Sequence, residues 1–270
     1  MDDDLIITTF VVIADVLRTL GHQDDCRARV SDAEVLTIAV VAAKYFQNHH
    51  AQAVIILGRL RYFSGRLSVS RFNRRLHRLA PWLEAVLPLL AATFAGGDVY
   101  ILDSLPVPVC KRVRRWHCRK VRGRAYCGYC KAKDEKFFGW RLHLVCTPAG
   151  VPVNFTLLPG AWHDLTPVHE LTWGLPTGAR VLCDKAYNSA RDEASILADT
   201  GVRLVPIRKA NMRPNDFADW CDLKYYRHGI ETRNSQLEKM GLERLYARTN
   251  EGLSLKVQAS LLALLCSNMN

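Results

Sequence analysis

The sequence predicts an all-helical N-terminal domain followed by an α/β domain whose mixed sheet is flanked by helices. In the first part of the 270-residue chain, apolar residues recur at helical spacing. After Gly96 and Gly97, short apolar runs and alternating segments typical of strands appear. A mixed α/β domain has this order of elements, with strands first, then a strand–helix–strand unit, and then helices. We therefore predict domains at residues 1–97 and 98–270.

Five helices are predicted in the first domain. Ser31 to Glu34 have the pattern of a capping box, and Pro81 suits the first turn of a helix. Two of the predicted helices cover residues 5–20 and 50–63. The other three begin at residue 31, at residues 68–70 and at residue 81.

The second domain begins with strands. Residues 140–146 and 151–158 read as a hairpin, because both are β-like and Pro-Ala-Gly lies between them. The other predicted elements are strands at 100–102, 181–183 and 202–205, a helix at 190–200, and closing helices that include residues 253–264.

Composition favours a globular protein with a polyanionic partner. Hydrophobic residues make up 49% of the chain, which excludes a disordered protein, and the formal net charge is +11. No apolar run reaches the ~18 residues of a membrane span. The apolar segment at residues 5–16 follows three aspartates, the wrong charge for a signal peptide. We therefore expect a cytoplasmic protein without membrane contact, with reduced cysteines.

Two aspartates share one local context. Asp103 follows Tyr100–Leu102 and Asp184 follows Val181–Cys183, each at the end of a strand that looks buried. Neighbouring strands lie ~4.8 Å apart, so such acids can share a metal cluster. Oxygen ligands suit Mg²⁺, and two such ions stabilise the attacking and leaving oxygens of a phosphoryl transfer. Alternatively, a strand-end aspartate caps a helix or pairs with Lys185 or an arginine.

Glu231 is the candidate for a third acid. Ile230 and Leu237 belong to the apolar stripe of its helix, and Glu231 lies one step, ~100°, from that stripe. Arg227, four residues earlier, would orient Glu231 or contact a phosphate. The alternative is an ordinary ion pair within the helix.

An acid-free arginine cluster lies between residues 59 and 78. Its fourth-helix members, which fall largely outside the apolar stripe, are Arg71, Arg74, Arg75 and Arg78. Such a face suits phosphate contact or entry into a DNA groove, as in helix-turn-helix proteins. A solvated charged face is the alternative.

A second basic segment, without an acidic residue from Lys111 to Arg124, belongs to an insertion at about residues 110–135 that follows Asp103. We expect it to hold a DNA end near the metals, with Trp116 and Tyr126 stacking on an unpaired base. Its candidate contacts are Arg112, Arg114, Arg115, Arg119 and Lys120. Alternatively, the insertion is a disordered loop that orders only on DNA.

The insertion also contains cysteines. Cys127 and Cys130 have zinc-knuckle spacing, and Cys118 or His117 would complete a site. Because a second Cys-x2-Cys pair is missing, free thiols are the favoured alternative to structural zinc.

Five ordered stretches resemble bacterial insertion-sequence transposases of the DDE class, and within them insertion-sequence family nine-eight-two. They are Ile101–Cys110, Gly139–Leu144, Leu158–Asp164, Cys183–Tyr187 and Ile230–Thr232.

The resemblance implies a ribonuclease-H-like catalytic domain in which the first and fourth strands are neighbours. It also implies that Asp103, Asp184 and Glu231 bind two Mg²⁺, with Mn²⁺ as a substitute. The implied substrate is double-stranded DNA, both terminal inverted repeats and target, and the implied assembly is a homodimer or larger. Lys185 and Arg227 join the candidate DNA contacts.

The chain departs from the related pattern at a few positions. Ala186 stands where glycine is common. A tyrosine and a lysine of the usual signature around Glu231 are each one residue out of register, which puts phosphate contacts by Tyr225, Tyr226 and Lys239 in doubt.

These features predict a transposase whose helical domain recognises the element end and helps dimerisation. Its catalytic domain would cleave one phosphodiester and join the freed 3′-hydroxyl to target DNA. The alternatives are a metal-dependent nuclease that never joins ends, a non-catalytic DNA-binding protein derived from a transposase, and an RNA-processing ribonuclease, since a fold does not choose its nucleic acid.

Overall fold

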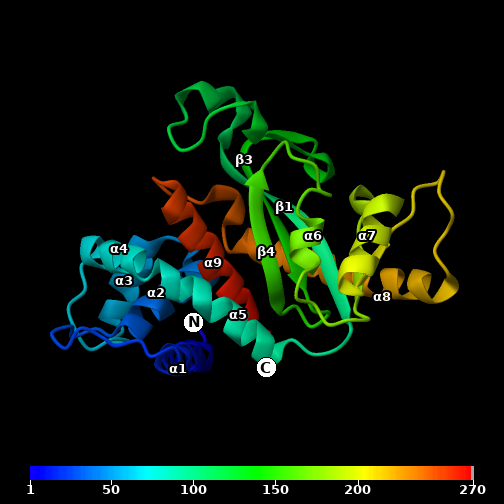
Figure 1. The fold of residues 1–270 in the computed structure, drawn as a ribbon. Coiled ribbons are helices and arrows are strands. Elements are labelled where there is room, and N and C mark those ends of the chain that lie inside the picture. Colours follow the sequence, from blue (N-terminus) through cyan, green and yellow to red (C-terminus); the bar gives the residue numbers. More distant parts are fainter. Residues whose placement is uncertain (269–270) are drawn as a thin grey trace. The chain divides into compact units, whose positions relative to one another are not determined.

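The computed structural model describes residues 1–268, without the side chains of residues 132, 227, 228, 230 and 231. The chain forms two compact units. One comprises Met1–Phe94 and Gln236–Asn270, and the other comprises Ala95–Ser235. Figure 1 shows the helices and strands of each.

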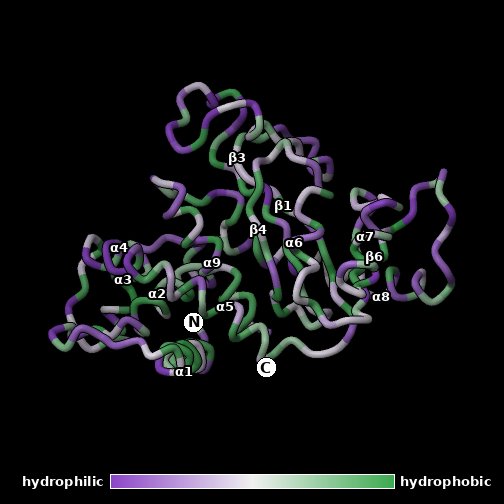
Figure 2. Tube along the Cα trace, in the orientation of Figure 1, coloured by the Kyte–Doolittle hydropathy of each residue, from purple (hydrophilic) through white to green (hydrophobic). Residues whose placement is uncertain are grey.

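The first unit is helical, as predicted. Its helices are α1 (Asp3–Thr19), α2 (Asp32–Phe46), α3 (His50–Arg59), α4 (Val69–Arg78), α5 (Ala80–Phe94) and α9 (Asn250–Ser267). The capping box at Ser31 and Glu34 is present at the start of α2, and Ser68 caps α4. Along its course α4 is mostly hydrophilic (Figure 2), as its arginines require.

The C-terminal segment differs from the prediction, because residues 236–270 group with the N-terminal helices rather than with the sheet. The cause lies in α9, which is buried from Leu255 to Cys266 and contacts α1, α2, α4 and α5. A helix that is apolar all round is stable only when neighbours cover every side of it.

The second unit is built on a six-stranded mixed sheet. Its strands are β1 (Val99–Lys111), β2 (Cys127–Cys130), β3 (Glu135–Cys146), β4 (Pro152–Pro159), β5 (Arg180–Cys183) and β6 (Arg203–Pro206). The order is β2-β3-β1-β5-β6, and β4 also pairs with β3. The predicted hairpin is β3–β4, and β1, β5 and β6 run parallel. This is the ribonuclease-H-like arrangement, with β2 added by the insertion.

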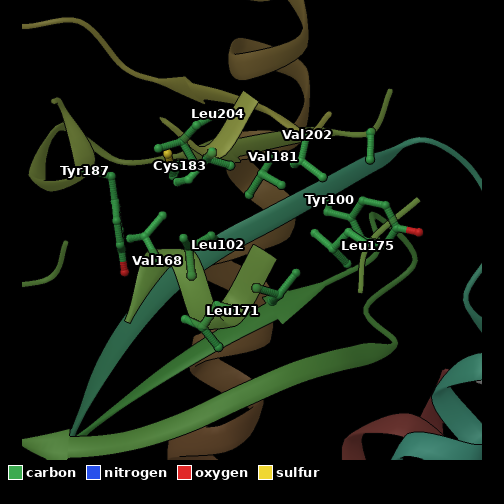
Figure 3. Packing of buried hydrophobic residues seen from close by; sticks show 13 residues of the cluster. Tyr100, Leu102, Val168, Leu171, Leu175, Val181, Cys183, Tyr187, Val202 and Leu204 are labelled. Atoms are coloured by element: carbon green, nitrogen blue, oxygen red, sulfur yellow. The ribbon is translucent and has the colours of Figure 1, made fainter. Parts of the chain in front are cut away.

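Helices cover both faces of this sheet. On one face, Leu102 and Val181 pack with Val168 and Leu171 of α6 (Val168–Thr172) and with Ile196 of α7 (Ala190–Thr200), as Figure 3 shows in part. On the other face, a smaller cluster includes Leu223 of α8 (Phe217–Lys239). Side chains alternate along β1, so Asp103 faces the α8 side. Among the described residues, no helix has the length and hydropathy to span a bilayer.

Candidate active site

Asp103 and Asp184 lie where the parallel pairing of two neighbouring strands stops. The expectation that Asp103 ends its strand is wrong, because β1 continues beside β3 to Lys111. In the parallel β1–β5 pair, Leu102 is opposite Cys183, and each aspartate is the next residue. Asp184 occupies the cap position of the short 3₁₀ helix Lys185–Tyr187, but its side chain makes no capping hydrogen bond. Among the described residues, no ion pair engages either carboxylate. Helix capping and ion pairing therefore do not explain these two acids.

The Asp103 carboxylate is held by neutral donors. Its Oδ1 accepts the Ser104 backbone N–H at 2.7 Å, and its Oδ2 accepts the Asn234 side-chain amide at 2.6 Å. Burial raises the pKa of Asp103 to about 6, the two hydrogen bonds oppose that shift, and the charges of Asp184 and Asp164 add to it. Asp184 and Lys185 are exposed, so the site opens to solvent beside a half-buried Asp103.

Asn234 belongs to α8, which is anchored beside β1. Arg233 Nη2 donates to the Ala149 carbonyl at 3.0 Å, and its guanidinium packs where a side chain on Gly150 would stand. Gly150 has a φ of +91°, so the turn between β3 and β4 uses glycine for both conformation and space. The predicted third acid, Glu231, lies on this helix, but its side chain and that of Arg227 are outside the described residues.

The donor set at Asp103 and Asp184 fits a divalent cation. Two carboxylates on adjacent strands repel each other, which contributes to the raised pKa of Asp103. A cation with a preference for oxygen ligands would remove this repulsion, and Mg²⁺ has that preference. No amine or guanidinium among the described residues fills that role.

A second polar cluster lies on the opposite face of the sheet, and the sequence assigned no role to its members. Ser104 Oγ donates to Asp164 Oδ1 at 3.0 Å. Arg141 Nη1 lies 3.3 Å from Ser104 Oγ and 3.8 Å from Asp164, while its Nη2 donates to the Tyr129 carbonyl of β2. The cluster thus links the insertion to Ser104, whose N–H holds Asp103.

His143 and Tyr187 complete this cluster. Their Nδ1 and hydroxyl oxygen are 3.3 Å apart, and His143 Nδ1 is 3.9 Å from Asp164. Burial lowers the pKa of His143 to about 4, Asp164 opposes that shift, and Arg141 adds to it. His143 is therefore neutral at physiological pH. Both residues lie in stretches that resemble insertion-sequence transposases, but only the folded structure shows that their side chains meet.

The basic insertion is well exposed at some of its predicted DNA contacts. Arg114 and Arg119 are exposed, and Trp116 is 81% exposed with the Arg115 guanidinium 4.4 Å from its ring centre. The remaining candidates, Arg112 and Lys120, are half-buried. Tyr126 is half-buried, and its ring makes T-shaped contacts with Phe138 and Trp140, so its stacking on a base stays a prediction.

The predicted zinc ligands do not converge. Cys118, Cys127 and Cys130 are half-buried free thiols, and no metal-binding group of three forms among the described residues of the insertion. Instead, Cys127 Sγ accepts a hydrogen bond from Arg115, and Cys118 adjoins Cys110. Among the described residues, the side chains close enough together to hold a metal ion are His22, Asp24 and Asp32 in the helical unit. Arg75 already binds Asp32 there.

Arg75 also departs from its predicted role as a DNA contact. It is only 8% exposed, its Nε and Nη2 bind Asp32, and its Nη1 donates to the Val30 carbonyl at 2.7 Å. Helical spacing predicts that Arg75 lies on the outer face of α4. In the structure, Asp32, which is distant in sequence, binds its side chain, and Arg75 is buried. Arg71, Arg74 and Arg78 are exposed.

A family model described as the transposase DDE domain matches residues 95–245, more than half of the chain. The chain belongs to the DDE transposase family. The matched segment of this transposase includes Asp103, Asp184 and Glu231. The narrower resemblance to insertion-sequence family nine-eight-two stays a prediction.

Two other comparisons add little to this. The chain is similar to a solved structure of the Mos1 transposase paired-end complex with left transposon end, at 14% identity over 84% of this chain and 82% of that one. The TM-score of this match is 0.26. No curated protein matches the chain.

Proposed function

We propose that this DDE transposase is the enzyme of an insertion sequence, which binds terminal inverted repeats, cleaves phosphodiester bonds and joins 3′-hydroxyl ends to target DNA. The observation that carries the proposal is the pairing of Leu102 with Cys183, which sets Asp103 and Asp184 on two adjacent parallel strands, each one residue past the last paired position. The family match supplies the reaction class.

The metal ligands in this proposal are Asp103, Asp184 and Glu231. When bound, a pair of Mg²⁺ ions, or Mn²⁺ in their place, would activate water and stabilise the attacking and leaving oxygens. Position 231 is one helical turn before Asn234, whose amide binds Asp103. Residues three apart on a helix share a face, which supports the choice of Glu231 as the third ligand.

The protein residues have separate tasks in the reaction. Asp103 is fixed by Ser104 and Asn234, so its carboxylate is held in one orientation before any ligand arrives. Lys185, exposed beside Asp184, and Arg227 would bind the phosphates that flank the scissile bond. Water attacks the phosphorus, the P–O3′ bond breaks, and the strand leaves with a free 3′-hydroxyl. That hydroxyl then attacks a target phosphodiester and displaces the target 3′-oxygen.

The remaining parts of the proposal concern partners and location. We propose that the helical unit recognises the element end, that two or more copies assemble on DNA, and that the insertion contacts the DNA end through Arg112, Arg114, Arg115, Arg119 and Lys120. We propose a cytoplasmic location, with the DNA-bound protein on the nucleoid.

The test is a cleavage and joining assay. Purified protein is incubated with a labelled element-end duplex and a plasmid target, with Mg²⁺ or EDTA, beside Asp184→Asn. Mg²⁺-dependent cleavage and joined product, both lost in the variant, are expected. Cleavage without joining would favour a nuclease of the same fold. DNA binding without any cleavage would favour a non-catalytic derivative, and preference for an RNA competitor would favour a ribonuclease.

A further inference from the structure

The helical unit contains a groove whose walls are rich in arginine. It has a volume of about 1050 Å³ and is lined by the loop before α2, by residues 64–67 and by α4. Seven arginines and two aspartates line it. Six of the arginines are exposed: Arg27, Arg29, Arg66, Arg71, Arg74 and Arg78.

Hydrogen bonds in the floor of the groove connect its two walls. Arg75, on the inner side of α4, donates to the Val30 carbonyl and to Asp32, which joins α4 to the opposite loop. Ser64 Oγ donates to the Arg29 carbonyl at 3.0 Å. A side chain on Gly65 would lie 2.9 Å from Arg29 Cβ, so the two loops are in close contact. The groove is therefore preorganised, and a ligand need not order it.

The charge inside the groove is unbalanced. Burial opposes ionisation of Asp32, but hydrogen bonds from Arg75 and His22 outweigh it and hold the pKa of Asp32 below its ordinary value. The Asp32 charge is thus already neutralised by partners in the floor. In the described part of the chain, no carboxylate forms an ion pair with the six exposed arginines. Like charges held together this way attract a polyanion.

The shape of the groove selects the kind of contact. A recognition helix must project from its protein to reach base edges in the major groove. Here Arg71, Arg74 and Arg78 line a recess with basic loops on its other side. A recess receives a convex ligand, and guanidinium forks match phosphate oxygens.

We infer that this groove binds the phosphodiester backbone of duplex DNA, with Arg29 on one wall and Arg74 on the other, and that its contacts are independent of sequence. The inference rests on the proposed function, since it takes DNA as the substrate. Of the two contacts expected for α4, it favours phosphate contact over entry into a DNA groove, and it adds Arg27, Arg29 and Arg66 to the predicted contacts.

The experiment measures DNA affinity by fluorescence anisotropy at a series of NaCl concentrations, in EDTA, with full-length protein. Two duplexes of equal length and composition are compared, an element end and its scrambled version. Arg29→Gln/Arg74→Gln removes one charge from each wall. Arg244→Gln/Arg248→Gln removes two exposed charges from the same unit outside the groove, and neither arginine forms an ion pair among the described residues. Arg29→Lys/Arg74→Lys tests rescue by charge, and circular dichroism checks that each variant is folded.

The groove variant is expected to lower the slope of log affinity against log salt by about 1.8, since each lost phosphate contact lowers it by about 0.9. At about 0.1 M salt the loss is roughly tenfold or more and is equal for both duplexes. The lysine variant recovers part of it, and the control retains the wild-type slope. Equal losses in the control and groove variants, or a loss confined to the element end, would overturn the inference.

The outcome is separable from that of the proposed reaction. If wild-type protein cleaves and joins DNA but the groove variant binds like the control, the reaction stands and the groove assignment fails. If the groove variant shows the expected loss but wild-type protein never cleaves, the groove assignment stands and the reaction fails.

Discussion

The side-chain amide of Asn234 donates a 2.6 Å hydrogen bond to Oδ2 of Asp103, a residue 131 positions earlier in the chain. This contact joins α8 to β1 inside one unit. It satisfies a carboxylate oxygen with a neutral donor, so it orients Asp103 without cancelling the charge that a metal would need.

Replacing Asn234 should therefore weaken metal binding. Asn234→Leu is expected to lower the affinity for Mn²⁺ about 10- to 100-fold, the usual effect of removing a group that orients a metal ligand. Isothermal titration of the full chain with Mn²⁺ measures it. The control is Asn154→Leu, which removes an amide that binds carbonyls of α6. Equal affinities in both variants would contradict the orienting role.

The raised pKa of Asp103 predicts a pH-dependent stability of the metal-free protein. A carboxyl whose pKa rises from 3.8 to about 6 on folding contributes stability that is full below pH 3.8 and is lost as the pH rises through 6. A tenfold change in proton affinity is about 1.4 kcal/mol, so the loss amounts to about 3 kcal/mol.

Asp103→Asn should remove this loss. Urea denaturation in EDTA is expected to show the variant more stable than wild type at neutral pH, because the neutral amide avoids the cost of a buried charge. The gain stays below about 3 kcal/mol, since an amide offers one acceptor oxygen to the two donors at Ser104 and Asn234. The gain should disappear as the pH falls to about 4. A variant less stable than wild type at neutral pH would show that Asp103 is not destabilised there.

The cluster around Asp164 should contribute to the stability of the sheet unit. Asp164→Ala leaves the Ser104 hydroxyl without its acceptor and Arg141 without its acidic partner, and the expected loss is about 2 kcal/mol in the free energy of unfolding. Asp164→Asn keeps an acceptor for Ser104 and should recover part of it. The exposed Asp199 serves as the control, and a loss of the same size in Asp199→Ala would deny Asp164 a specific role.

Two glycines near the site should respond to alanine in opposite directions. At Gly139, in β3, a Cβ would meet the Val107 carbonyl and the Val109 N–H of β1 at 2.6 Å, so Gly139→Ala should cost about 1–3 kcal/mol. At Gly229, in α8, a Cβ meets nothing within 4 Å, so Gly229→Ala should add about 0.5–1 kcal/mol. Thermal denaturation gives both values, and shifts of the same sign would contradict this packing.

The parts of the fold that sequence could predict are those with local signals. The capping box at Ser31 marked the start of α2, and Pro-Ala-Gly marked the hairpin turn between β3 and β4. The sequence indicates Asp103 and Asp184 because each directly follows a short apolar run. These two runs lie in the neighbouring strands β1 and β5.

The parts that sequence could not predict depend on distant contacts. Asn234 and Asp164 carry no local pattern, and only the fold brings them to Asp103 and Ser104. Arg75 was assigned to the outer face of α4 because helical spacing does not reveal Asp32, 43 residues earlier. The grouping of α9 with α2 and α5 was missed for the same reason, since an apolar helix does not specify which helices cover it.

The central claim is that Asp103 and Asp184 jointly bind a divalent cation. Its most direct test is Mn²⁺ binding, measured by electron paramagnetic resonance at neutral pH on wild-type protein, Asp103→Asn, Asp184→Asn and the surface control Asp199→Asn. Wild type and the control are expected to bind Mn²⁺ alike, and either site variant is expected to abolish or strongly weaken binding. Binding by both site variants with wild-type affinity would contradict it.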